Sequence, residues 1–232
     1  MSLRDEPIEL AEALLTAYRA QIDAFVELAD RFCQVVVGRN RYTQVGFLQA
    51  IESPLAELYF RASALPDEEL WFSDDEDEAE GDAESPEGGL SGHEDGALHT
   101  DDESAFPILL TSRIDVSQQL EIMHDIEGLL GEFNLYREVY DPYGNDEALN
   151  GSLGDDIASL YALLATHLPL FRSREVPAMR EALWNWRFGF DSHEGEHVTG
   201  ALRAIYALLR QSRPHWDDDA WDDGRLVPFK EP

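Results

Sequence analysis

The chain has 232 residues, of which 44% are hydrophobic, and a formal net charge of −31 at pH 7. No apolar run approaches the roughly 18 residues of a membrane span, and the first residues, MSLRDEPIEL, lack the basic start and apolar segment of an export signal. The single cysteine, Cys33, cannot form an internal disulfide, which favours a reducing cytoplasm. The 17 basic residues form no stripe that could replace the counterions of a nucleic acid, which argues against nucleic-acid binding.

Residues 1–66 are predicted to form two helices of a bundle. Apolar side chains recur every three or four positions over Ile8–Val37, which is the spacing of one face of a helix. A second helix is expected over Tyr42–Leu65, with Thr43 as its cap. Because Ser53-Pro54 falls inside this helix and proline removes a helical hydrogen bond, we expect a kink there, or a restart capped by the serine.

Residues 67–112 are predicted to be a disordered acidic insert. Between Asp67 and Glu103 there are 17 acidic residues and no lysine or arginine. Such a segment repels itself and has little apolar surface to bury, so it has no reason to pack. We interpret it as a solvated insert, with a decoy for a basic partner or a metal buffer as the functional alternatives.

Residues 113–211 are predicted to form the remaining helices of the bundle. Asp115 and Gln118 have the spacing of a capping box, which indicates that a third helix begins there. Ser152 and Asp155 repeat this pattern at the start of a fourth helix, which is expected to end near Phe171.

A long C-terminal helix is the expected spine of the bundle. Pro177 is typical of a first helical turn, and apolar side chains then keep helical spacing through Glu181–Leu209. An acidic tail containing scattered aromatic residues follows over 212–232. No segment of four or more residues alternates between apolar and polar, so no β-sheet is predicted. The expected fold is an all-α bundle of about five helices.

Two sequence blocks resemble a bacterial family known as DUF5063, a domain of unknown function. The first block is Tyr136–Tyr143, followed by Gly151–Leu153 and the pair Asp155-Asp156; the second is Trp184–Phe188, followed by His193, His197 and Ala201–Ala204. The resemblance extends over Ile8 to about Arg210, without the acidic insert. It implies a helical fold with a conspicuous polar and aromatic cluster. The family has no established activity, so the resemblance assigns no reaction.

The segment His193–His197 matches the H-E-x-x-H pattern of zinc proteases. That chemistry needs both histidines on zinc, Glu194 as the general base and a third ligand further along the chain. The position that supplies the third ligand in one class of these enzymes is Arg203, a cation that cannot bind a metal. Zinc proteolysis is therefore not predicted.

A second metal hypothesis suits a helical bundle better. Two pairs, Glu121 with His124 and Glu194 with His197, have the E-x-x-H spacing that di-iron proteins place on two helices. Such a site also needs a glutamate from each of two other helices. The first two helices offer Glu12, Glu27, Glu52 and Glu57, but the fourth offers only Asp155 and Asp156. The set is incomplete, so a metal-binding bundle remains the alternative function.

Helical phase predicts that His193 and His197 face inward with Trp186 and Phe190. A buried imidazole needs a hydrogen-bond partner, which Asp141, Asp155 or Tyr143 could supply. Arg187 is expected to hold a carboxylate such as Asp141 or Asp156, or to stack on Trp184. These residues form either a structural cluster or the wall of a binding pocket. The candidate set is Tyr140, Asp141, Tyr143, Trp184, Trp186, Arg187, His193 and His197.

The sequence thus favours a cytoplasmic, non-enzymatic interaction or adaptor module over an enzyme. Its expected partner is another protein, with neither nucleic acid nor membrane involved, and no cofactor is predicted. The alternative is a metal-binding helical bundle, of a di-iron-like or zinc type.

Overall fold

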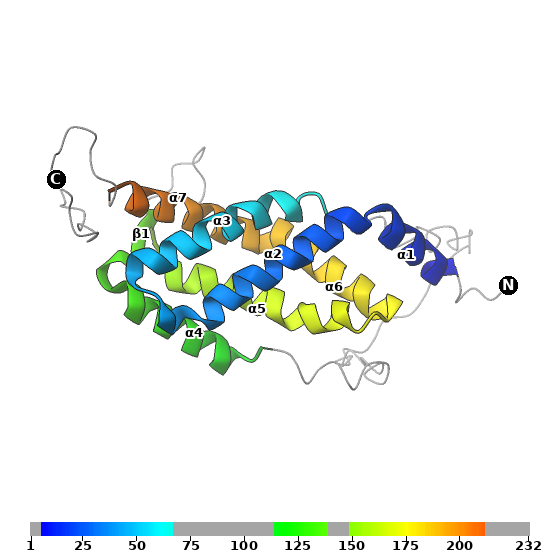
Figure 1. The fold of residues 1–232 in the computed structure, drawn as a ribbon, viewed down its shortest axis with the longest axis horizontal. Coiled ribbons are helices and arrows are strands. Elements are labelled where there is room, and N and C mark those ends of the chain that lie inside the picture. Colours follow the sequence, from blue (N-terminus) through cyan, green and yellow to red (C-terminus); the bar gives the residue numbers. More distant parts are fainter. Residues whose placement is uncertain (1–5, 67–113, 139–148, 212–232) are drawn as a thin grey trace, which may run out of the picture.

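The fold comes from a computed structural model that describes residues 6–66, 114–138 and 149–211. The predicted insert (67–112) and tail (212–232) lie outside these residues. The described helices run mostly along the long axis of the molecule (Figure 1), and helices from both sides of the insert share one hydrophobic core. The prediction of a helical bundle is confirmed. None of the described helices is both long and apolar enough to cross a membrane.

The N-terminal part contains three helices where two were predicted. Helix α1 spans Glu6–Ala17 and helix α2 spans Arg19–Val37, so the expected single helix is divided at Tyr18. The amide of Tyr18 still donates to the Leu14 carbonyl, and its own carbonyl still accepts from Ile22. Helical hydrogen bonds therefore flank the break, and the apolar spacing continues across it. This is why the pattern predicted one helix.

Helix α3 spans Gln44–Ala62 and follows a short 3₁₀ turn, η1, at Arg39–Arg41. The Thr43 cap is confirmed, because its hydroxyl accepts a hydrogen bond from the amide of Gly46 at 3.2 Å. The predicted restart at Ser53 is wrong: Pro54 lies buried inside one continuous helix.

Helix α4 spans Val116–Leu130 and begins with the predicted capping box, in which Asp115 and Gln118 bond to each other's backbone amides. It ends at Gly131, whose φ of 58° lies in the left-handed region that favours glycine. A 3₁₀ turn, η5 (Gly131–Phe133), leads to the first strand. Helix α5 spans Leu153–Arg172, and its predicted cap is also confirmed, because Ser152 accepts from the amide of Asp155.

A two-stranded antiparallel sheet corrects the prediction that no strand is present. Strand β1 (Leu135–Glu138) pairs with β2 (Leu149–Ser152), and Tyr136 lies opposite Gly151. A strand of four residues places only two side chains on each face, too few for a pattern of alternation. A Cβ atom on Gly151 would lie 2.5 Å from the tyrosine ring, so the pairing depends on glycine at this position.

The C-terminal spine is confirmed as one continuous helical run, but it is not uniform. Helix α6 (Val176–Gly189) passes into a π-helical turn, η6 (Phe190–Glu194), and then into α7 (Gly195–Gln211). Helix α5 packs against α6, α4, α7 and α2, while α3 packs against α2 and α7. In Figure 1, α1 lies at one end of the molecule, and β1 lies beside the last turns of α7 at the other end.

Candidate functional site

The π-turn changes which side chains of the spine face the core. The amide of Gly195 donates to the Phe190 carbonyl, five residues earlier, and a Cβ at position 195 would lie 2.6 Å from that same oxygen. A turn closed over five residues holds more residues than an α-helical turn, so the phase of the helix shifts there. Glu194 is buried with 6% exposure, whereas His193 is exposed. The prediction that His193 faces inward is therefore wrong, whereas Trp186 and Phe190 are buried as predicted.

His197 binds the hairpin and α5 together through a buried carboxylate. Its Nδ1 donates to Asp156 Oδ1 at 2.8 Å, and the Tyr136 hydroxyl donates to Asp156 Oδ2 at 2.8 Å. The exposed fractions of the His197 and Asp156 side chains are 15% and 5%. Tyr136 comes from β1, Asp156 from the first turn of α5 and His197 from the first turn of α7. The three side chains thus join three elements that are distant in the sequence.

The two histidines also contact each other. His193 Nε2 and His197 Nε2 lie 3.0 Å apart, and the two rings are nearly perpendicular, with centroids separated by 4.4 Å. When neutral, His197 keeps its proton on Nδ1 because Asp156 accepts it there, so its Nε2 carries a lone pair. One imidazole then donates to the other across this contact.

The space around this network is filled. The Tyr136 hydroxyl also lies 3.4 Å from Glu138 Oε2. A Cβ atom on Gly200 of α7 would be 2.4 Å from Glu138 Oε1. Arg203, on the same helix, donates to the backbone carbonyl of Arg137 at 3.0 Å. Helix α7 therefore packs directly against the inner face of the hairpin, with a glycine at the point of closest approach.

Burial sets the electrostatics of the acidic groups. Removal from water raises the pKa of Asp156, although hydrogen bonds from His197 and Tyr136 oppose this effect. Burial, followed by the nearby charge of Asp156, also raises the pKa of Glu138 and that of the Tyr136 hydroxyl. The hydrogen bond to Asp156 raises the pKa of His197 and outweighs the opposing effect of burial. The cluster therefore favours a protonated His197 and weakly acidic carboxyl groups.

Glu194 is a second buried acid beside the histidines. Its Oε1 accepts a hydrogen bond from Ser159 of α5 at 2.8 Å, while its Oε2 is buried and has no hydrogen-bond partner among the described residues. Burial raises the pKa of this carboxyl, and both His193 and His197 partly offset that rise through their charge. Glu194 thus lies close enough to both imidazoles to interact with them electrostatically.

The aromatic and arginine candidates lie in two different environments. Trp186 is fully buried and packs against Phe25 and Phe171, with ring centroids 5.1 and 5.8 Å away, so it belongs to the core. Trp184 is partly buried at the edge of the core and stacks on Phe188, with ring centroids 5.1 Å apart. Tyr140, Asp141 and Tyr143 lie outside the described residues.

Arg187 holds a carboxylate as expected, but the carboxylate is that of Asp191, one turn along, at 2.7 Å. Its Nη1 also donates to the Ala62 carbonyl at the end of α3, at 3.2 Å. This arginine therefore joins the spine to the C-terminal turn of α3.

The E-x-x-H pair on α4 lies at the surface. Glu121 and His124 are both exposed, and His124 Nδ1 lies 3.0 Å from Glu127 Oε2. Within the described part of the chain, no group of three or more His, Cys, Asp or Glu side chains is placed to hold a metal ion.

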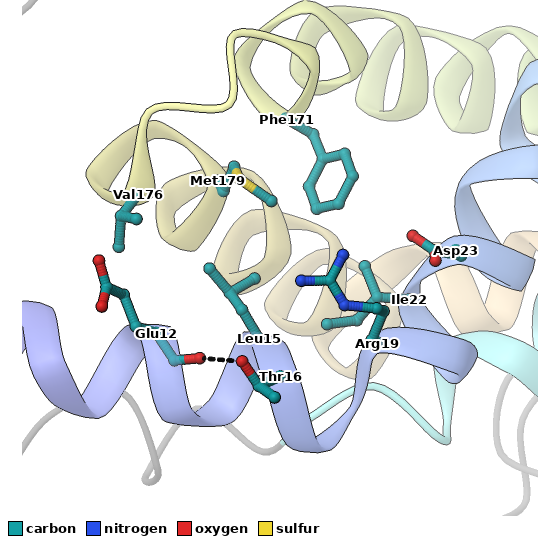
Figure 2. A pocket seen from close by; sticks show the side chains of 9 residues that line it. All are labelled: Glu12, Leu15, Thr16, Arg19, Ile22, Asp23, Phe171, Val176 and Met179. Atoms are coloured by element: carbon teal, nitrogen blue, oxygen red, sulfur yellow. Dashed lines mark hydrogen bonds between the residues drawn. The ribbon is translucent and has the colours of Figure 1, made fainter.

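A pocket of about 300 Å³ lies away from this cluster, where α1, α2, the end of α5 and the start of α6 meet. Leu15, Ile22, Phe171 and Met179 give it an apolar wall, while Glu12, Arg19 and Asp23 supply charged groups (Figure 2). None of the eight residues of the candidate set lines this pocket, although Glu12, one of the glutamates considered for a di-iron site, does. The predicted pocket around the histidines includes Tyr140 and Tyr143, so it stays a prediction.

Sequence reasoning missed the residues that hold His197. It named Asp155 as a partner, but Asp155 is exposed and the adjacent Asp156 makes the contact. Tyr136 and Asp156 both lie in the first block of the family resemblance, which was the available signal. Glu138 lies in the same block but was given no role, and Ser159 stood in no motif; the contacts of both appear only when the elements pack.

Comparison with known proteins supports the family resemblance over the second half of the chain. Residues 105–211 match the model of DUF5063, described as a domain of unknown function. This part of the chain belongs to the DUF5063 family. The match begins at residue 105, within the last residues of the predicted insert, so the N-terminal helices, which the predicted resemblance included, lie outside it. No curated protein matches the sequence.

Comparison with solved structures finds a protein of similar fold. It is protein BF1032 from Bacteroides fragilis, with a TM-score of 0.57 and 18% sequence identity, covering 83% of this chain and 93% of that one. At this identity the likeness concerns the fold alone. The match covers more of the chain than the DUF5063 match does, so the similarity of fold extends beyond that domain.

Proposed function

We propose that this DUF5063 protein is a non-enzymatic interaction module and that its polar cluster has a structural role. The observation that carries this proposal is that the cluster is closed. The Tyr136 hydroxyl and His197 Nδ1 both bond to Asp156, His197 Nε2 lies against His193, and Gly200 leaves no room for a methyl group beside Tyr136 and Glu138. A catalytic site needs space for a substrate next to its acid or base. The pocket described above lies among other residues.

The cluster stabilises the position of the hairpin. Each hydrogen bond to the charged Asp156 contributes roughly 1.5–3 kcal/mol, and loss of one partner leaves a buried acid without its hydrogen bond. The network thus anchors β1 to α5 and α7.

The surface proposed for a partner lies where the end of α3 meets the spine. Phe60 is 67% exposed, and Tyr59 and Phe188 are each 46% exposed. Two contacts bring these segments together: Arg187 bonds to the Ala62 carbonyl, and the Tyr59 ring lies 3.9 Å from the Cβ position of Gly195. Exposed aromatic residues are typical centres of protein interfaces.

The net charge of −31 indicates the chemistry of the partner. We propose a protein with an apolar contact area surrounded by basic groups, because opposite charges steer association and exclude acidic competitors. A cytoplasmic location is part of this proposal, and its support is the composition of the chain, with its single cysteine.

The test begins with affinity capture on the immobilised chain and continues with titration of the purified candidate partner. Joint replacement Phe60→Ser and Phe188→Ser should weaken binding roughly tenfold or more, since central aromatic residues carry most interface energy. Leu135→Ser, at an exposed leucine of the hairpin, is the matched control and should leave binding unchanged. Binding should also weaken as salt rises.

Two results would contradict the proposal. One is that the double variant binds every purified partner with the same affinity as the unmodified protein. The other is turnover of a substrate that His197→Ala abolishes while the fold is retained.

A further inference from the structure

We propose that the Nε2 atoms of His193 and His197 form a two-nitrogen site for a divalent transition-metal ion of the Cu²⁺, Ni²⁺ and Zn²⁺ group. The site goes beyond the interaction role proposed above and does not depend on it. It consists of one exposed imidazole from the π-turn and one largely buried imidazole from the first turn of α7. Imidazole nitrogen is a preferred ligand for this group of metals.

The surroundings of His197 support a ligand role. Its Nδ1 donates to Asp156 Oδ1, and Asp156 is itself held by the Tyr136 hydroxyl, each at 2.8 Å. Metal-binding histidines almost always donate their second ring N–H to a carboxylate, a carbonyl or water in this way, which fixes the ring and leaves the other nitrogen for the metal. The Nε2 that this arrangement leaves is the atom 3.0 Å from His193.

The distance between the two nitrogens indicates the preferred geometry. With a metal–nitrogen distance of roughly 2.0–2.1 Å, a separation of 3.0 Å gives an angle of about 95° at the metal. This is nearer to the right angle of tetragonal Cu²⁺ and Ni²⁺ sites than to the tetrahedral angle of Zn²⁺. We therefore expect Cu²⁺ or Ni²⁺ to bind at about the present separation of the two nitrogens, after the rings turn so that both lone pairs point at the ion. Zn²⁺ should require a wider separation.

No third protein ligand completes the site among the described residues, so water would occupy the other positions. The exposure of His193 gives the ion access from solvent. Glu194 lies close enough to interact electrostatically with both imidazoles, and its buried Oε2 has no hydrogen-bond partner in this part of the chain. Metal binding displaces the proton shared by the two Nε2 atoms. A protonated His197 releases this proton to solvent; when both rings start neutral, it leaves Nε2 through solvent and His193 Nδ1 takes up one proton, so that neutral imidazoles bind the ion.

The first test is calorimetric titration of the tag-free full chain with NiCl₂ in an excess of Mg²⁺. Carboxylates prefer hard cations, so Mg²⁺ occupies the acidic segment and leaves the imidazoles available. The wild type should bind one equivalent tightly, and His193→Ala should lose that equivalent while keeping its circular dichroism spectrum. Asp156→Asn should lower the affinity roughly 10–100-fold. His124→Ala, at an exposed histidine beside a carboxylate, is the control and should bind like the wild type.

The second test identifies the ligands directly. Electron paramagnetic resonance of the Cu²⁺-loaded protein should show two imidazole nitrogens in the wild type and one in His193→Ala. Equal Ni²⁺ binding by the wild type and His193→Ala, or a Cu²⁺ spectrum unchanged by that substitution, would overturn the proposal and leave a simple hydrogen bond between the two rings.

Discussion

Gly200→Ala tests whether α7 is packed tightly on the hairpin. The added Cβ atom would lie 2.4 Å from Glu138 Oε1 and 2.5 Å from the Tyr136 hydroxyl. Real Cβ contacts are essentially never shorter than 3.0 Å, so something must move. Because Asp156 holds the Tyr136 hydroxyl, a shift of that hydroxyl also breaks a buried hydrogen bond.

Two opposing effects set the size of the change. Replacing glycine by alanine inside a helix stabilises it by about 0.5–1 kcal/mol. Forcing a methyl group into filled space costs about 1–3 kcal/mol. Gly128→Ala in α4 provides a matched control, since nothing lies within 4 Å of the Cβ position there. Both variants gain the same stabilisation from alanine in a helix. The free energy of unfolding of Gly200→Ala should therefore be lower than that of Gly128→Ala by about 1–3 kcal/mol, the cost of the steric clash.

Urea denaturation of both variants and the wild type measures this difference. Addition of Glu138→Ala to Gly200→Ala should recover part of the loss, because it removes the nearest atom, and a double-mutant cycle quantifies this coupling. Equal free energies of unfolding for Gly200→Ala and Gly128→Ala would refute the tight contact between helix and hairpin.

Three further predictions concern the cluster and the core. His197→Ala should lower the free energy of unfolding by roughly 1–3 kcal/mol, because it leaves buried Asp156 without this hydrogen-bond donor. His197→Gln, which keeps a donor, should recover part of this loss. Wild-type stability in both variants would contradict the pairing of His197 with Asp156. The raised pKa of His197 means that its stabilising contribution is full below the ordinary value of 6.5 and is lost as pH rises through the raised value. Denaturation from pH 5 to 8 should therefore show a steeper fall for the wild type than for His197→Gln, and parallel curves would count against this linkage. Trp186→Ala should cost about 3–5 kcal/mol in the same assay, whereas a loss below about 1 kcal/mol would mean that the site is not a packed core position.

The helices and most of their starting points could be predicted from the sequence. Thr43, Asp115 and Ser152 cap their helices through contacts within three residues, and such contacts need no tertiary structure. Apolar spacing likewise predicted the buried face of the spine as far as Phe190. These features depend on neighbours along the chain, so the pattern alone determined them.

Tertiary structure decided the hairpin and the partners of the spine. Tyr136, Asp156 and His197 meet across separations of 20 and 41 residues, and no local pattern pairs residues so far apart. Helical spacing alone does place Asp156, three residues after Leu153, on the buried face of α5, a signal that the choice of Asp155 overlooked. The two strands are too short for an alternation pattern, and their pairing relies on the Tyr136 ring packed over Gly151. Beyond Phe190 the π-turn altered the helical phase, which buried Glu194 and exposed His193. A period of 3.6 residues cannot predict such a shift, because the wider turn becomes favourable only when its side chains meet the packed bundle.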